Sequence, residues 1–342
     1  MNSLYLFAIV STVLSVIFTP IVKRIALKLQ VIDMPEEDRR IHNKPMPLLG
    51  GLSIYFSFII TLLLKKGDFT RPEMGLVLGA TIIVIGGFLD DKFDIKPRYK
   101  LIFQIAAALI LIIYGVKIVI ITNPFSSVYQ FTNVGVMSIP LTIIWVVGIT
   151  NALNLIDGLD GLASGIGFIS SLTILIIALL NNRYEAAVLA IILCGAILGF
   201  LPYNFNPASI FMGDTGAQLL GFLLAAISIG GAIKSAAAFS IAVPILALGI
   251  PIYDTLFAMI RRKINGKPIM QADRGHLHHR LLDMGFSQKQ AVGTMYAISA
   301  VLGSFSIIAM EINAQLSYFL LAIIMVALVF IAWRAGFFQH RD

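Results

Sequence analysis

Long apolar segments recur through most of the chain, and they constrain its fold more than any other feature. Runs of about 17–25 apolar residues cross a bilayer as α-helices, because a helix satisfies its own backbone hydrogen bonds where water is absent. Of the 342 residues, 58% are hydrophobic and 13% are charged, whereas about a quarter of the residues in a soluble domain are charged. The sequence therefore predicts an all-α polytopic membrane protein and excludes a soluble one.

We predict eleven membrane-spanning helices in a single integral-membrane domain that covers residues 1–342. Their approximate bounds are 3–22, 48–64, 73–89, 100–116, 138–153, 162–180, 186–201, 216–231, 236–260, 290–310 and 316–333. Residues 117–137 are rich in β-branched side chains and predict a small hairpin. The first span lacks a basic segment before it, which is typical of a retained anchor and not of a cleaved signal peptide.

Lysine and arginine are distributed unevenly between alternate loops. One set of loops holds 19 of the 25 basic residues and the other holds 6. Because cytoplasmic loops carry the excess of Lys and Arg, the N-terminus is predicted to lie outside and the C-terminus in the cytoplasm. Topology and contact with anionic head groups or phosphorylated substrates then explain the net charge of +7 better than a nucleic-acid partner does.

The segment NALNLIDGLDG places two amides and two carboxylates at three-residue steps: Asn151, Asn154, Asp157 and Asp160. Polar groups beside membrane-grade apolar runs are expensive, which favours a functional role over helix packing. Each three-residue step on a helix lags about 60° behind a full turn, so all four side chains cannot converge on one face. We predict that the Asn pair ends one helix and that the two Asp residues lie in the turn that follows. Gly158 in that turn would let the backbone approach a ligand closely.

Adjacent carboxylates, Asp90 and Asp91, close the third predicted helix. Successive helical residues point about 100° apart, so the two side chains are predicted to take different roles, such as metal contact and proton acceptance. Negative charge at the C-terminal end of a helix opposes its macrodipole, so stability alone does not account for the pair. Lys100 begins the next predicted helix, where a fixed cation would be placed to hold phosphate.

The segment PYNFNPASIFMGDTG contains no Lys or Arg that would neutralise Asp214. Thr215 and Gln218 form a capping-box pattern, which predicts a helix that starts just after this carboxylate. Oxygen ligands and phosphates suit Mg²⁺, so a divalent cation is the predicted partner of Asp214, with simple complementation of the helix dipole as the alternative. Phe211 is interpreted either as packing or as a surface on which a base stacks.

Asp254 lies about two turns inside the ninth predicted helix, where a functional role and a structural partner, such as a basic residue one helical face over, both stay open. The last predicted cytoplasmic loop reads ADRGHLHHRLLDMGFS and contains His276, His278 and His279. No Cys is nearby and no Glu stands at the metalloprotease spacing, so recognition of a diphosphate is favoured over zinc. The first predicted cytoplasmic loop, DRRIHNKPMPLLGG, repeats this basic character and includes Lys44.

The order of these motifs resembles that of the polyprenyl-phosphate N-acetylhexosamine-1-phosphate transferases: DDxxD, NxxNxxDGLDGLA, NxxPAxxFMGDxG and HLHHR. The resemblance covers nearly the whole chain. The HLHHR loop is similar to that of the branch that makes undecaprenyl-diphospho-GlcNAc for wall teichoic acid or O-antigen, and less similar to that of the phospho-MurNAc-pentapeptide transferases. It implies transfer of GlcNAc-1-phosphate from UDP-GlcNAc to undecaprenyl phosphate, with release of UMP and a requirement for Mg²⁺ that Mn²⁺ would also meet.

The resemblance also implies roles for individual residues. Asp214 and Asn154 match the metal-binding positions. Positions implied to carry catalysis or to contact the diphosphate are Asp90, Asp91, Lys100, His278, His279 and Arg280. Asp160, Asn204 and Phe211 match nucleotide-pocket positions, with Phe211 stacking on uracil. The motifs themselves add five further predicted substrate-binding residues: Asn151, Asp157, Gly158, Lys44 and His276.

The expected surroundings are a bacterial plasma membrane, with the active site facing the cytoplasm and no nucleic acid involved. A homodimer is a further expectation. A secondary transporter would show paired broken helices in two similar halves, and no internal repeat is visible. A CDP-alcohol phosphotransferase would follow its DG with Ala-Arg, whereas this chain reads DGLDGLASG. A non-enzymatic scaffold would have no use for the acidic cluster. Direct transfer and a covalent aspartyl-phosphate intermediate both remain open.

Overall fold

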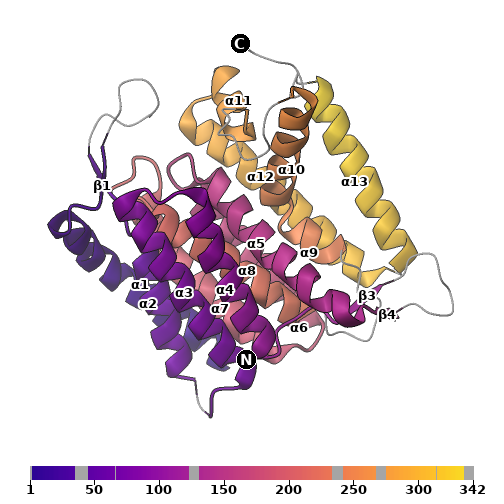
Figure 1. Ribbon diagram of the computed structural model, residues 1–342, viewed down its shortest axis with the longest axis horizontal. Helices are drawn as coiled ribbons and strands as arrows, with labels where there is room; N and C mark the ends of the chain where they lie inside the picture. Colours follow the sequence, from indigo (N-terminus) through magenta and orange to yellow (C-terminus); the bar gives the residue numbers. More distant parts are fainter. Residues whose placement is uncertain are drawn as a thin grey trace.

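A computed structural model describes residues 2–34, 45–65, 67–122, 131–232, 242–266, 275–312 and 314–334. These residues are predominantly helical (Figure 1). The α-helices are α1 (Asn2–Lys28), α2 (Gly51–Leu63), α3 (Arg71–Phe93), α4 (Pro97–Ile113), α5 (Ser138–Ile156), α6 (Leu162–Leu180), α7 (Tyr184–Asn204), α8 (Gly213–Ala232), α9 (Ala242–Ala247), α10 (Gly249–Ile264), α11 (Leu277–Asp283), α12 (Gln288–Glu311) and α13 (Ala314–Arg334). The strands are β1 (Ile32–Asp33), β2 (Met46–Pro47), β3 (Ile120–Thr122) and β4 (Phe131–Asn133), and a short 3₁₀ turn, Gly135–Met137, precedes α5.

Seven of the described helices are long and apolar enough to cross a membrane: α1, α3, α5 with the turn before it, α6, α7, α8 and α12. Together with the helical content, they support the predicted class of an all-helical, multi-pass membrane protein. The predicted number of eleven membrane-spanning helices stays a prediction.

The ninth predicted span is interrupted, contrary to the expectation of one helix over residues 236–260. α9 ends at Ala247, Leu248 leaves the helical conformation, and α10 restarts at Gly249. Pro251 has no N–H to donate to Ala247, so the chain accommodates it in the first turn of a new helix.

Helix α8 lies at the centre of the fold and packs against α2, α3, α5, α6 and α7. The N-terminal and C-terminal helices α1 and α13 lie on opposite flanks (Figure 1). Gly87 lets the end of α3 reach the start of α8, because a Cβ at Gly87 would lie only 2.5 Å from Thr215 Cα. This close approach joins two helix ends that carry carboxylates.

Two short hairpins lie outside the helical bundle. β3 and β4 pair antiparallel, with Ile120 opposite Asn133, so the predicted hairpin within residues 117–137 is confirmed. β1 and β2 pair with Ile32 opposite Pro47. The carbonyl oxygen of Pro47 also accepts from Phe211 N at 2.9 Å, and Gly50 N donates to Phe211 O at 2.9 Å. These bonds fix the loop before α8 against the start of α2.

Candidate active site

A cavity of about 1070 Å³ lies where α3, α5 and α7 end and α8 begins. Its wall is strongly acidic. The lining carboxylates are Asp33, Asp90, Asp91, Asp94, Asp157, Asp160 and Asp214. Among the described residues, Lys100 is the single lysine or arginine in the lining. So much negative charge around one ammonium group makes the cavity a place where further cations would bind favourably.

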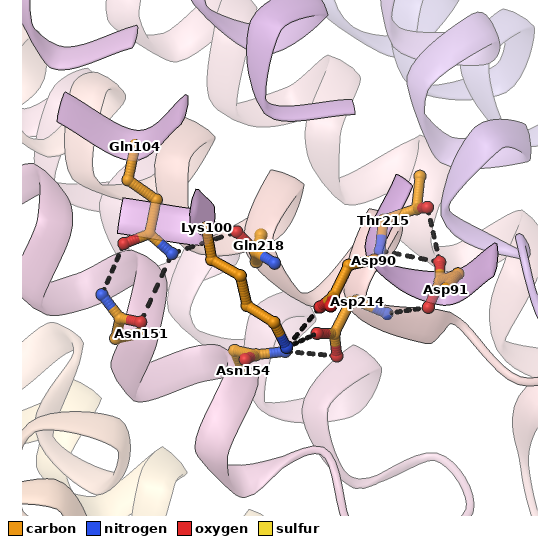
Figure 2. Close-up of polar contacts among 9 residues, drawn as sticks. All are labelled: Asp90, Asp91, Lys100, Gln104, Asn151, Asn154, Asp214, Thr215 and Gln218. Carbon is orange, nitrogen blue, oxygen red and sulfur yellow. Dashed lines mark hydrogen bonds and ion pairs between the residues drawn. The ribbon is translucent and has the colours of Figure 1, made fainter. Parts of the chain in front are cut away.

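Lys100 points its ammonium group toward two of the acidic side chains, Asp90 and Asp214 (Figure 2). Its Nζ forms one ion pair with Asp214 Oδ2 at 2.7 Å and another with Asp90. The other oxygen of Asp214 accepts from Asn154 Nδ2 at 2.8 Å. We call Asp90, Lys100, Asn154 and Asp214 the acidic centre. Its four members come from four helices, α3, α4, α5 and α8.

Asp91 points away from its neighbour Asp90 and caps the start of α8. Its carboxylate accepts from Asp214 N at 2.7 Å, Thr215 N at 3.0 Å and Thr215 Oγ1 at 2.5 Å. The predicted capping box of Thr215 and Gln218 is therefore wrong, and α8 begins at Gly213, three residues before the predicted start at residue 216. An ionised carboxylate is a stronger acceptor for orphan helix N–H groups than a hydroxyl, and it also complements the positive end of the helix.

The stretch after Asn154 adopts the predicted helix–turn–helix arrangement. α5 ends at Ile156 and α6 begins at Leu162. Burial in the cavity wall, together with the negative charge of nearby Asp214, Asp91 and Asp160, raises the pKa of Asp157 to about 8. Burial is the larger cause and the neighbouring carboxylates add to it, so a cation bound beside Asp157 would lower this pKa again.

The donor set fits a hard cation that completes its shell with substrate phosphates. Carboxylate and amide oxygens surround the cavity, and Mg²⁺ prefers such oxygens. Within the described ranges, no group of three His, Cys, Asp or Glu side chains is arranged to hold a metal ion alone. A site with few protein ligands is how Mg²⁺ is usually bound beside phosphates.

Asp160 fastens the turn to the loop between α7 and α8. Its Oδ2 accepts from Asn206 Nδ2 and from Ala208 N, both at 3.0 Å. Asn206 also donates to Gln288 Oε1 at 2.7 Å, and Asn206 and Gln288 both line the cavity. The sequence carries no signal for Asn206 and Gln288, because both lie in polar segments where an amide side chain is ordinary.

Two further predicted substrate residues belong to the same wall. Asn204 is buried; it accepts from Ser164 Oγ at 2.7 Å and donates to Ile210 O at 3.2 Å. These bonds hold α6 against the loop that carries Phe211. Phe211 lies in the cavity lining, on the strand-like contact with Pro47.

The loop before α11 is anchored by Asp254. His276 Nδ1 lies 2.7 Å from Asp254 Oδ2, and Leu277 N donates to Asp254 Oδ1 at 2.8 Å. The sequence left open a functional role or a structural partner for Asp254. The structure shows a structural partner, His276, which lies just before α11 and not on the helix that carries Asp254. His276 is buried in this contact and is absent from the cavity lining.

His278, His279 and Arg280 diverge. His278 is 1% exposed, and it packs so closely on Gly158 that a Cβ there would lie 2.5 Å from its Nε2. Burial, with a smaller contribution from His279, lowers the pKa of His278 to about 3, so its imidazole is neutral. His279 lines the cavity, whereas Arg280 is buried and its Nε donates to Gly275 O at 3.3 Å.

The structure thus brings most predicted site residues to one cavity and leaves others behind its wall. Predicted residues in the lining are Asp90, Asp91, Lys100, Asp157, Gly158, Asp160, Asn204, Phe211, Asp214 and His279. Predicted residues outside the lining are Asn151, Asn154, His276, His278 and Arg280. Lys44 falls outside the described residues.

Asn151 turns away from the cavity. Its Nδ2 donates to Gln104 Oε1 at 2.6 Å and to Val147 O at 2.8 Å. Gln104 also donates to Gln218 Oε1 at 3.0 Å (Figure 2). The sequence did carry a signal for Gln104, because an amide inside the run KLIFQIAAALILII needs a partner on another helix.

The fold and the site define a multi-pass membrane protein whose acidic cavity suits a cation bound together with phosphate groups. A family model described as "Glycosyl transferase family 4" matches residues 74–232. This range contains the acidic centre, the turn after Asn154 and the loop before α8.

The relatives match over nearly the whole chain. A probable undecaprenyl-phosphate N-acetylglucosaminyl 1-phosphate transferase of Bacillus subtilis is 40% identical, over 97% of this chain and 92% of the relative. A decaprenyl-phosphate N-acetylglucosaminephosphotransferase of Mycolicibacterium smegmatis is 34% identical, over 86% and 79%. A phospho-N-acetylmuramoyl-pentapeptide-transferase of Halalkalibacterium halodurans is 31% identical, over 89% and 95%. The chain belongs to glycosyl transferase family 4 and is an enzyme of the phosphotransferase class.

Proposed function

We propose that the protein transfers GlcNAc-1-phosphate from UDP-GlcNAc to undecaprenyl phosphate, and that it releases UMP and forms undecaprenyl-diphospho-GlcNAc. The product would start a cell-envelope glycopolymer such as teichoic acid or O-antigen. The relatives of Bacillus subtilis and Mycolicibacterium smegmatis support the sugar and the class of lipid acceptor. The observation that carries the proposal is Lys100 held between two carboxylates in the wall of a cavity at the end of the membrane helices.

The chemistry of this transfer matches what the acidic centre offers. An oxygen of the lipid phosphate forms a bond to the phosphorus that carries the sugar, and the bond from that phosphorus to the UMP oxygen breaks. Such a reaction needs alignment and neutralisation of phosphate charge more than covalent help from the protein. Lys100 is suited to orient a phosphate oxygen, and Asp90, its ion-pair partner, is suited to orient or deprotonate the acceptor.

We propose Mg²⁺ as the cofactor, with Mn²⁺ as a substitute. Asp214 and Asn154 would hold it, and a bound cation would favour the ionised form of Asp157, which lines the same cavity. When bound, the ion would neutralise negative charge on the phosphate oxygens. Phe211 and Asp160, both in the lining, would contact the nucleotide, and His279 would contact the diphosphate or sugar.

We propose that the protein lies in the plasma membrane of a bacterium and that its cavity faces the cytoplasm. The excess of Lys and Arg in one set of loops supports this orientation.

A covalent aspartyl-phosphate intermediate stays the competing mechanism to direct transfer. A single-turnover reaction without acceptor, using UDP-GlcNAc labelled in its sugar, would distinguish the two mechanisms. Only the covalent mechanism, in which UMP leaves as GlcNAc-1-phosphate bonds to an aspartate, would leave label on the protein.

The test of function is product analysis with purified protein in detergent. The protein is incubated with undecaprenyl phosphate, Mg²⁺ and one UDP-sugar from a small panel, and the lipid product is separated by thin-layer chromatography. We expect a lipid diphosphate sugar and UMP with UDP-GlcNAc. Product formed only with UDP-MurNAc-pentapeptide would move the protein to the branch of the Halalkalibacterium halodurans relative. Movement of a solute into liposomes without any UDP-sugar would instead support a transporter.

A further inference from the structure

Three amide side chains meet inside the helical bundle, away from the cavity: Gln104 of α4, Asn151 of α5 and Gln218 of α8, which we call the amide triad. Gln104 exchanges hydrogen bonds with Asn151 at 2.6 and 3.3 Å and donates to Gln218 Oε1 at 3.0 Å. Gln104 is 1% exposed and Gln218 is 2% exposed. None of the three lines the cavity, so none is placed to touch a substrate there.

Each residue of the amide triad lies one helical turn from a residue of the acidic centre on the same helix, α4, α5 or α8. Gln104 follows the lysine of the centre by four residues, Asn151 precedes its asparagine by three, and Gln218 follows its aspartate by four. A turn of α-helix is roughly 3.6 residues, so each amide lies one turn from its counterpart, rotated around the helix by about 40° for a four-residue step and about 60° for a three-residue step. Figure 2 shows the two groups side by side, with Lys100 and Gln104 on the same helix.

The amide triad joins two helices that do not pack closely on each other. α4 packs against α3 and α5, and α8 packs against α3 and α5 as well, but α4 and α8 are not close neighbours. Two side-chain bridges cross from α4 to α8, Lys100 to Asp214 at 2.7 Å and Gln104 to Gln218 at 3.0 Å. Asn151 links the second bridge to α5, as Asn154 links the first.

Buried amides in a membrane bundle are costly unless they are bonded across helices. Gln218 Nε2 has no hydrogen-bond partner among the described residues, so this side chain is used through its oxygen alone. An apolar residue of similar size would avoid that unsatisfied donor. The amide triad is therefore better explained by its effect on the relative position of α4 and α8 than by a gain in folding stability.

We propose that Gln104, Asn151 and Gln218 are positioning residues that set the separation of α4 from α8, and through it the distance between Lys100 and Asp214. This proposal concerns the same site as the proposed function. Its test therefore includes a measurement that does not depend on transfer activity, on Mg²⁺ or on any substrate.

The measurement is the reactivity of the Lys100 amine. Purified protein is treated with a low concentration of acetic anhydride, and acetylation of Lys100 is followed by mass spectrometry relative to the exposed Lys96. In Gln104→Met we expect Lys100 to react about threefold faster or more, since an ammonium group held by two carboxylates is a poor nucleophile until it is released. We expect kcat for UMP release to fall about tenfold or more, with the KM for UDP-GlcNAc within about twofold, because misplacement acts on the transition state.

Asn181→Leu is the matched control. Asn181 is a half-buried amide that donates to Ile177 O at 2.8 Å, and it directly follows the last residue of α6, at the opposite end from the cavity. It should leave the Lys100 reactivity and kcat unchanged. If Gln104→Met does not fold, Gln218→Met removes one hydrogen bond of the amide triad in place of three and should give the same effects, smaller in size.

Unchanged Lys100 reactivity in a folded Gln104→Met or Gln218→Met variant would overturn the proposal, whether or not kcat falls. Faster acetylation in the Asn181→Leu control would also overturn it, since the effect would then be general loosening. If the wild-type protein made no lipid product from any UDP-sugar, the proposed function would fail, while the Lys100 reactivity would still decide the role of the amide triad.

Discussion

Replacing Asp91 by alanine tests whether this carboxylate serves as the cap of α8 or takes part in the chemistry itself. In the structure it accepts three hydrogen bonds, from Asp214 N, Thr215 N and Thr215 Oγ1, at 2.5–3.0 Å. Asp91→Ala removes all three hydrogen bonds at once. The start of α8, which carries Asp214, then loses its attachment to the end of α3.

The expected loss of stability follows from these bonds. A lost N-cap costs about 0.5–2 kcal/mol, and a hydrogen bond to a charged group contributes about 1.5–3 kcal/mol. Water in the adjoining cavity will recover part of this, so we expect the unfolding free energy to fall by about 2–4 kcal/mol. Thr215→Val removes one of the three bonds and should cost about 1 kcal/mol. Because Asp214 is displaced, UMP release by Asp91→Ala should fall about 100-fold.

The assay combines unfolding in mixed detergent micelles, followed by far-UV circular dichroism, with UMP release. Asp90→Ala is the matched comparison, since the neighbouring carboxylate contacts Lys100 and none of the α8 backbone in the described contacts. It should abolish activity with a smaller loss of stability, because Lys100 keeps its ion pair with Asp214. If Asp91→Ala abolished activity while its unfolding free energy stayed within about 0.5 kcal/mol of wild type, the capping role would be refuted.

Four further outcomes follow from the site. Asp214→Asn should lower Mg²⁺-dependent UMP release about 1,000-fold in a folded protein, and full activity would remove its metal assignment. Phe211→Ala should raise the KM for the UDP-sugar about tenfold and that for the lipid much less; equal effects would indicate packing. Without divalent cations, the unfolding free energy should fall as pH rises from about 4 to about 8, because folded Asp157, with its pKa raised to about 8, keeps a proton that the unfolded chain has lost. Asp157→Asn should flatten that fall in a pH series of unfolding curves, and an unchanged slope would contradict the assignment. Gly158→Ala should cost about 1–3 kcal/mol in thermal unfolding, since its Cβ would lie 2.5 Å from His278 Nε2; a wild-type melting curve would show that the contact yields freely.

The elements of this protein were largely predictable because their signals are local. Apolar runs of membrane length predicted the helices, and β-branched residues predicted the hairpin of β3 and β4. The 60° lag between three-residue steps predicted that Asn154 would end a helix and that Asp157 would follow in a turn. The same angular reasoning predicted that Asp90 and Asp91 would face different partners.

The partners themselves depended on how helices pack, which the sequence does not specify. The sequence places Asp91 beside Asp90, but only the approach of α3 to α8 at Gly87 makes Asp91 the cap of another helix. It places Asn151 in the motif with Asn154, but the position of α4 turns Asn151 toward Gln104. A motif fixes which chemical groups are present and their angles along one helix. Which groups meet is decided by the crossing of helices far apart in the chain, since a hydrogen bond requires contact within about 3 Å.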